Sequence, residues 1–105
     1  MTGLIVISTY SSIDDASKIV KGAIERRLAA CANLIPIRSI YSWKGKIEDN
    51  GEILVIYKTT VAKAKSLHAY IEETHSYDVP EVMDIAMDGV SKKYLNWLSD
   101  STSQG

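Results

Sequence analysis

The sequence predicts an α+β fold with one antiparallel sheet, and three observations support this. Two short runs, residues 4–7 and 53–57, are continuously apolar, as strands buried on both faces are. Residues 32–43 and 83–87 alternate apolar and polar positions, as half-buried strands do. Two further segments have apolar residues at helical spacing. The chain order is therefore strand, helix, strand, strand, helix, strand, with a short helix at the end.

Length and composition exclude several classes of protein. The 105 residues suffice for one compact domain, residues 1–105, and 46% hydrophobic with 24% charged residues excludes a disordered or collagenous chain. The 12 Lys and Arg against 13 Asp and Glu give a net charge of −1, so no nucleic-acid partner is expected. One cysteine, no signal-peptide pattern and no apolar run long enough for a bilayer predict a cytoplasmic protein without a membrane partner.

The first strand, residues 4–7, precedes a helix with clear start and stop signals. Ser12 is a candidate N-cap, and Asp15 falls in the first turn, where a negative charge is favourable. Arg26 and Arg27 suit the negative C-terminal end. The inner stripe of this helix is expected to comprise Ala16, Ile19, Val20, Ala23, Ile24 and Leu28.

The second and third strands form a predicted hairpin. Pro36 interrupts residues 32–43, and because proline cannot donate to a ladder, this strand should lie at an edge or carry a bulge. Two turns are possible before the next strand, residues 52–59: Lys44-Gly45, or Asp49-Asn50-Gly51 with its favoured Asn-Gly pair. The pattern does not choose between them.

The second helix is expected from a Thr60 cap to about Thr74, and Pro80 prevents its continuation. Its predicted inner stripe is Ala64, Leu67, His68 and Ile71. Met83, Ile85 and Met87 then mark the apolar side of the fourth strand. Ser91 begins the short terminal helix, and residues 99–105 are expected to be a polar, flexible tail.

This order is that of the ferredoxin-like β-α-β-β-α-β fold with an added C-terminal helix. The first and third strands then lie in the centre, and they are the two continuous apolar runs. Right-handed crossovers place both long helices on one face. The other face is apolar but uncovered by these helices, which predicts a homo-oligomer; the alternative is that the short terminal helix covers it.

The residues with metal or redox chemistry are few. Cys31 is either a packed small side chain or a thiolate ligand. His68 and His75 would be roughly 10 Å apart on one helix, too far to share a metal ion. His68 is either a packed helix residue or a ligand, and His75 is either a helix-terminal residue or a ligand. If His75 is a ligand, the carboxylates near it in sequence suit Cu(II), Zn(II) or Ni(II) without choosing among them. The sequence shows no recognisable pair of nucleophile and base, so we do not expect an enzyme.

Five stretches resemble the CutA family of divalent-cation tolerance proteins, in the same order. They are LAACANLIP (28–36), SIYSWKGKIE (39–48), EILVIYKT (52–59), HSYDVPEV (75–82) and YLNWL (94–98). The family's usual His-Pro-Tyr-Glu-Val-Pro-Glu differs here at Ser76 and Asp78. Ser76 removes a rigid turn residue, and Asp78 shortens the reach of the carboxylate by one methylene.

The resemblance implies a non-catalytic, PII-like homotrimer that binds copper or other divalent ions in the response to metal ions and requires no cofactor. By position, the implied metal-ligating residues are His75, Asp78 and Glu81, with Cys31 and His68 as further candidates. The implied inter-subunit cleft comprises Tyr41, Trp43, Lys58, Tyr77 and Glu81. Two alternatives are a PII-like regulator that binds a small metabolite in this cleft, and a trimeric scaffold for a protein partner that the sequence does not identify.

Overall fold

A computed structural model describes residues 2–103 and contains one four-stranded antiparallel sheet and three helices. The strands are β1 (Gly3–Tyr10), β2 (Cys31–Trp43), β3 (Lys46–Thr60) and β4 (Met83–Ala86). The helices are α1 (Ile13–Glu25), α2 (Val61–Thr74) and α3 (Lys92–Thr102). This element order confirms the predicted α+β, ferredoxin-like class. None of these helices of residues 2–103 is long and apolar enough to cross a membrane.

The sheet has the strand order β2-β3-β1-β4, so the two continuous apolar runs lie in its centre as predicted. Pro36 lies in the edge strand β2 opposite Ile53, within an uninterrupted register. The edge position therefore explains why proline is tolerated here, because a residue whose N–H would face the free edge of the sheet does not have to donate to a neighbouring strand.

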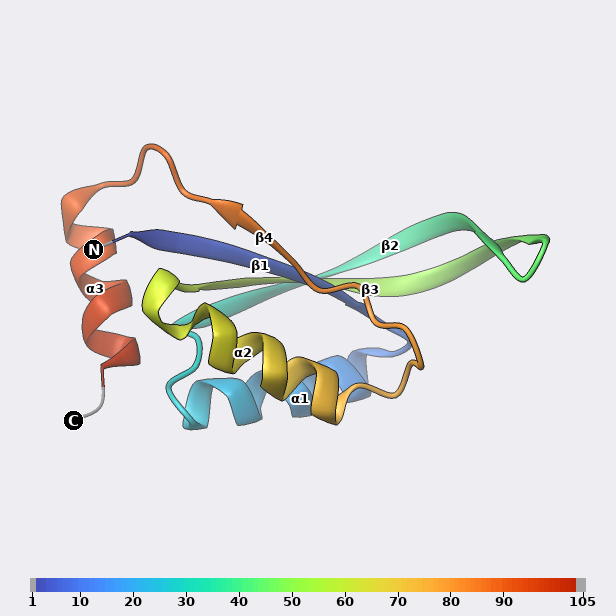
Figure 1. The fold of residues 1–105 in the computed structure, drawn as a ribbon, viewed down its shortest axis with the longest axis horizontal. Coiled ribbons are helices and arrows are strands. Elements are labelled where there is room, and N and C mark those ends of the chain that lie inside the picture. Colours follow the sequence, from blue (N-terminus) through green and yellow to red (C-terminus); the bar gives the residue numbers. More distant parts are fainter. Residues whose placement is uncertain (1, 104–105) are drawn as a thin grey trace.

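Helices α1 and α2 cover one face of the sheet, and the core lies between them and the sheet (Figure 1). Alternate residues of β1 point into this layer, since side chains of a strand alternate between faces. The buried apolar side chains include Leu4, Val6, Tyr10, Ala16, Ala23, Val55, Tyr57, Leu67 and Ile71. Within the core, the hydroxyl groups of Tyr10 and Tyr57 form a 2.6 Å hydrogen bond. Because this bond gives each hydroxyl group a hydrogen-bond partner, both phenols can be buried.

The start of α1 is as predicted, whereas its end comes earlier. The Ser12 hydroxyl accepts a 3.1 Å hydrogen bond from the backbone N–H of Asp15. The helix ends at Glu25, so Leu28 is not helical, because Arg27 adopts a left-handed conformation with φ 58°. The N–H groups of Arg27 and Leu28 bond back to the carbonyls of Ile24 and Ala23. This is a Schellman motif.

The hairpin between β2 and β3 turns at Lys44-Gly45, where both residues have positive φ, 50° and 79°. Two successive positive φ angles are those of the type I′ turn that suits a two-residue hairpin. Asn50 and Gly51 lie inside β3 instead. The hairpin consequently forms a long arm, residues 37–52, which projects beyond the two helices (Figure 1).

Two expectations about the C-terminal part need correction. Residues 99–102 belong to α3 and are not a tail, because the helix buries Leu98 and Thr102 and needs an apolar stripe on one side only. The Thr102 hydroxyl also donates to the Leu98 carbonyl at 2.8 Å. Of the rest of the expected tail, Ser103 is exposed and follows the helix, and Gln104 and Gly105 lie outside the described residues. Strand β4, expected to be half-buried, is exposed along all four residues in a single chain.

Candidate functional site

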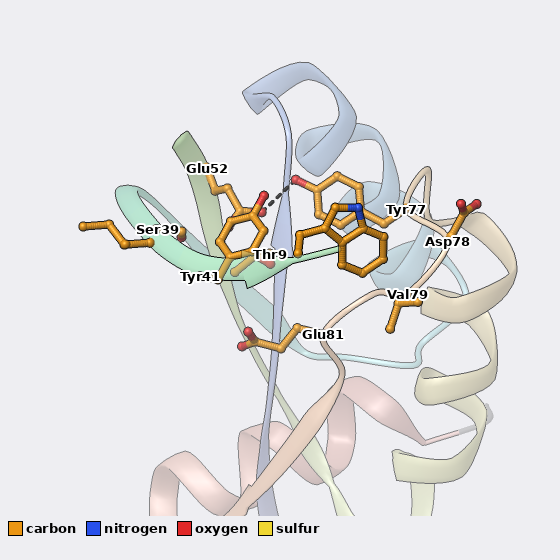
Figure 2. A pocket seen from close by; sticks show the side chains of 10 residues that line it. Thr9, Ser39, Tyr41, Glu52, Tyr77, Asp78, Val79 and Glu81 are labelled. Carbon is orange, nitrogen blue, oxygen red and sulfur yellow. Dashed lines mark hydrogen bonds between the residues drawn. The ribbon is translucent and has the colours of Figure 1, made fainter. Parts of the chain in front are cut away.

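A cavity of about 530 Å³ lies between the arm and the segment that follows α2 (Figure 2). Thr9 from β1 contributes to its floor, so three parts of the chain meet there. Ten residues line it: Thr9, Ser39, Ile40, Tyr41, Trp43, Glu52, Tyr77, Asp78, Val79 and Glu81.

Strand β2 supplies a polar and aromatic wall. Ser39, Tyr41 and Trp43 are two positions apart, so their side chains share one face of the strand. The Tyr41 hydroxyl accepts a 3.2 Å hydrogen bond from Nδ2 of Asn50 across the arm. The Nζ atom of Lys44 lies 5.7 Å from the centre of the Trp43 ring, within cation–π range. Both rings of this wall are thus held by residues of the arm.

Tyr77 and Glu52 join the two sides of the cavity. The Tyr77 hydroxyl donates a 2.7 Å hydrogen bond to Oε2 of Glu52, drawn as a dashed line in Figure 2. Burial and the neighbouring Glu52 carboxylate raise the pKa of Tyr77 above its ordinary value. The phenol therefore remains a proton donor, and the carboxylate is held against an aromatic ring.

His75 lies beside the cavity and positions one of its walls. Its Nε2 donates to the Thr9 carbonyl at 2.7 Å, and its Nδ1 accepts from the Tyr77 backbone N–H at 3.1 Å, which assigns the proton to Nε2. The ring stacks on Tyr10, with centres 4.6 Å apart and planes 13° apart. Both nitrogens are therefore occupied, and the imidazole fixes the start of the 77–81 segment.

The other two histidine and cysteine candidates lie elsewhere. Nε2 of His68 on α2 contacts the carboxylate of Asp84 on β4, at a partly exposed position. Sγ of Cys31 lies 3.5 Å from the hydroxyl of Tyr94 on α3. That contact, together with burial, raises the pKa of Tyr94 to about 12.

The structure brings together most of the predicted cleft residues but not the predicted metal ligands as one group. Tyr41, Trp43, Tyr77 and Glu81 line the cavity, and so does Asp78. Lys58 does not line it, since its ammonium donates to the side-chain oxygen of Asn33. Within residues 2–103, no three or more His, Cys, Asp or Glu side chains are placed to hold one metal ion.

The sequence analysis missed five of the lining residues: Thr9, Ser39, Ile40, Glu52 and Val79. The signals available were a carboxylate immediately before the apolar run 53–57, and the position of Ser39 two residues before Tyr41. Neither reveals Tyr77 as the partner of Glu52, because the two are 25 positions apart.

The chemistry of the lining is negative and aromatic. Glu52, Asp78 and Glu81 provide three carboxylates, and none of the ten lining residues within the described chain is Lys, Arg or His. Such a cavity attracts positive ligands and repels anions. Fold and cavity together define a small α+β protein of the ferredoxin-like class.

Comparison with known proteins places the chain more closely. Residues 4–101 match the family model of the CutA1 divalent ion tolerance protein, and the chain belongs to this family. The divalent-cation tolerance protein CutA of Pyrococcus horikoshii is 41% identical over 101 residues, which cover 96% of this chain and 99% of that one.

Solved structures agree with this assignment. CutA1 from Oryza sativa has a TM-score of 0.95 at 34% identity, covering 100% of this chain and 97% of that one. A protein from Archaeoglobus fulgidus, named a periplasmic divalent cation tolerance protein CutA, has a TM-score of 0.94 at 32% identity, covering 96% and 99%.

Proposed function

We propose that this protein acts in the response to metal ions by binding a divalent ion, with copper(II) favoured, as a non-catalytic cytoplasmic homotrimer. The observation that carries the metal proposal is the contact between the imidazole of His68 and the carboxylate of Asp84. Imidazole with carboxylate is a donor set suited to Cu(II), Zn(II) or Ni(II), and copper has the highest affinity among divalent ions of this series.

The surroundings of the two histidines favour His68 over His75. The side chains of His68 and Asp84 are 30% and 37% exposed, so an ion can reach both and replace the proton between them. An ion at His75 would have to break its bonds to Thr9 and Tyr77. Two protein ligands leave further positions for water or for a residue of another subunit.

The trimer proposal rests on the face of the sheet opposite α1 and α2. Met83 and Ile85 on β4 are 48% and 46% exposed there, although they alternate as a strand with one buried side does. Ile35 on the opposite edge strand is also exposed. Exposed apolar side chains on one face of a sheet are typical of an interface, and closed symmetric assemblies of identical chains are the usual way to cover them.

The metal proposal is tested by native mass spectrometry of the reduced protein during a Cu(II) titration. We expect a small, saturating whole number of ions per trimer, and an affinity at least about tenfold lower in the His68→Ala variant. Lys65→Ala, on the same helix, serves as the matched control and should bind normally. Graded adducts without saturation, or unchanged affinity in His68→Ala, contradict the proposal.

The trimer is tested separately by sedimentation at micromolar concentration. We expect a trimer for the unmodified protein and dissociation for Ile85→Asp, because a buried, unpaired carboxylate at the interface is costly. Asp88→Asn, an exposed change beyond the end of β4, is the control. A monomeric unmodified protein contradicts the assembly while leaving the metal proposal to its own test.

A further inference from the structure

We propose that the groove between α1 and α2 binds a small linear zwitterion, a molecule with a carboxylate at one end and an ammonium group at the other. This interhelical groove has a volume of about 410 Å³, which is within the range of small-molecule sites. Its lining residues belong to α1, to α2 and to the residues directly after each helix. It shares no residue with the cavity beside the arm or with the His68–Asp84 contact.

The interhelical groove lies on the side of the molecule away from the proposed subunit interface. Helices α1 and α2 cover one face of the sheet (Figure 1), whereas Met83 and Ile85 are exposed on the other. Each chain therefore holds the complete groove, and an assembly through the exposed face of the sheet leaves it open.

The floor of the groove is rigid before a ligand arrives. Tyr70 reaches from α2 to α1, where its hydroxyl is hydrogen-bonded to the Ile19 carbonyl. Gly22, which carries no side chain, leaves room for this hydroxyl on the surface of α1. The tyrosine ring is thus held between the two helices, and a floor fixed in this way loses little freedom when a ligand binds.

Two cations provide the carboxylate end of the site. Lys18, Gly22 and Arg26 follow one another at four-residue intervals, so they share one face of α1. The Arg26 guanidinium lies 5.0 Å from the centre of the Tyr70 ring and donates to the Gly22 carbonyl at 3.3 Å. Within residues 2–103, neither cation forms an ion pair with a carboxylate. A carboxylate beside Gly22 would be within reach of both, and a guanidinium offers five N–H donors.

The other end of the groove is negative. Helices α1 and α2 run in opposite directions (Figure 1), so the end of α2 lies beside Asp15 at the start of α1. The C-terminal end of a helix has a partial negative charge that favours cations, and in the described chain the last turn of α2 carries no basic residue. The hydroxyls of Thr74 and Ser76 are additional acceptors. This end therefore attracts an ammonium group.

The distance between the two ends sets the length of the ligand. Asp15 and Gly22 are seven positions apart, which is roughly 10 Å along α1. A simple anion would be attracted to the two cations and repelled by Asp15, and a simple cation would meet the reverse. A linear amino acid with several methylene groups between its charges satisfies both ends, so 6-aminohexanoate is a suitable probe.

The experiment compares 6-aminohexanoate with hexanoate and hexylamine, which each lack one of its charges, by calorimetry on the full chain in EDTA. We expect one molecule of 6-aminohexanoate per chain, bound at least about fivefold more tightly than either analogue. Equal affinity for hexanoate or for hexylamine would show a site for a single charge and overturn the proposal. The absence of saturable binding up to about 10 mM, or fewer than one molecule per chain, would overturn it as well.

Variants of the two cations test the carboxylate end. Lys18→Gln and Arg26→Gln should each weaken 6-aminohexanoate binding about three- to tenfold, because each removes a charged donor. Lys21→Gln, on α1 but outside the lining, is the matched control and should bind normally. Unchanged affinity in both Lys18→Gln and Arg26→Gln contradicts the proposed site.

Variants at the negative end test the position of the ammonium group. Asp15→Asn should weaken binding about threefold, whereas Asp14→Asn, its neighbour outside the lining, should not. Ser76→Pro removes the hydroxyl and should also weaken binding. The proline is tolerated there, because His75 before it is already extended, with ψ 142°. Unchanged affinity in both Asp15→Asn and Ser76→Pro would contradict the assignment of this end.

Two further variants separate this inference from the other sites. Glu52→Gln changes the cavity beside the arm, and His68→Ala changes the proposed metal contact. We expect both to bind 6-aminohexanoate as the unmodified protein does. Weaker binding in Glu52→Gln would place the ligand in the other cavity, and weaker binding in His68→Ala would show that the groove depends on the metal contact; either result overturns the proposal. Failure of copper binding alone would not affect the groove.

Discussion

A Cβ atom on Gly22 would lie 2.0 Å from the hydroxyl oxygen of Tyr70. This tyrosine reaches from α2 across to α1, where its hydroxyl donates a 2.8 Å hydrogen bond to the Ile19 carbonyl. The glycine thus provides the space in which the two helices are joined. Its role is close approach and not turn formation, since it lies within α1.

We therefore expect Gly22→Ala to destabilise the protein by about 1–2 kcal/mol. Overpacking costs roughly 1–3 kcal/mol, and the better helix propensity of alanine offsets up to about 1 kcal/mol. Urea unfolding measures the change. Adding Tyr70→Phe removes the clashing oxygen, so the second substitution should cost less in the Gly22→Ala background than alone. Additive losses would contradict this explanation.

The left-handed residue at the end of α1 offers a stabilising change. Arg27 has φ 58° at the position of the Schellman motif that glycine usually occupies. Arg27→Gly should raise the free energy of unfolding by about 0.5–1 kcal/mol, less any contribution from its exposed hydrogen bond to the Ser103 carbonyl. Arg26→Gly, one residue earlier at an ordinary φ of −85°, is the control and should not stabilise.

The buried tyrosine pair predicts a loss of stability at alkaline pH. Burial raises the pKa of Tyr10 and Tyr57, and the proximity of Tyr10 raises that of Tyr57 further. Above pH 10, the unfolded chain releases these protons while the folded chain keeps them, so stability falls as pH rises. The contribution of the two tyrosines to stability is fully present below pH 10. Urea unfolding across this range should show a smaller loss in Tyr57→Phe, and an equal loss would contradict the assignment.

His75 is predicted to contribute more to stability than His68. His75→Ala removes two hydrogen bonds and a stacked ring, which should cost about 2–3 kcal/mol. His68→Ala at the partly exposed contact should cost no more than about 0.5–1 kcal/mol. Thermal unfolding of the two variants checks this order, and equal losses would show that the Thr9 and Tyr77 contacts contribute little.

The topology was predictable because it follows from local patterns. Continuous apolar runs, alternating runs and helical stripes each span a few residues, and the order of the strands follows from them. The position of the hairpin turn was not predictable, because Asn50-Gly51 is the stronger local turn signal. The long ladder from Cys31 opposite Lys58 to Trp43 opposite Lys46 selects Lys44-Gly45 instead. Register over thirteen residues outweighs one favourable dipeptide.

The site was predictable only in part, and mainly through family resemblance. Tyr41, Trp43, Tyr77 and Glu81 do line one cavity. The hydrogen bonds of His75 were beyond sequence reasoning, because one acceptor is the backbone carbonyl of Thr9, 66 positions away. Every residue has a backbone carbonyl and nearly every residue a backbone N–H, so the sequence does not indicate which of them a histidine will contact. Whether the nitrogens of a histidine are free to bind a metal ion is therefore known only from the folded structure.

The shape of the arm has a consequence for local opening. Residues 37–43 pair with residues 46–52, whereas β1 pairs with β3 only from Ile53 onward, so within the described chain this ladder has two strands alone. Ile47 at its far end is 82% exposed. A two-stranded ribbon by itself is marginally stable in water. The amide hydrogens of the arm in a lone chain should therefore exchange with solvent much faster than those of the central strands. Slower exchange in the arm would indicate that another molecule has bound to it.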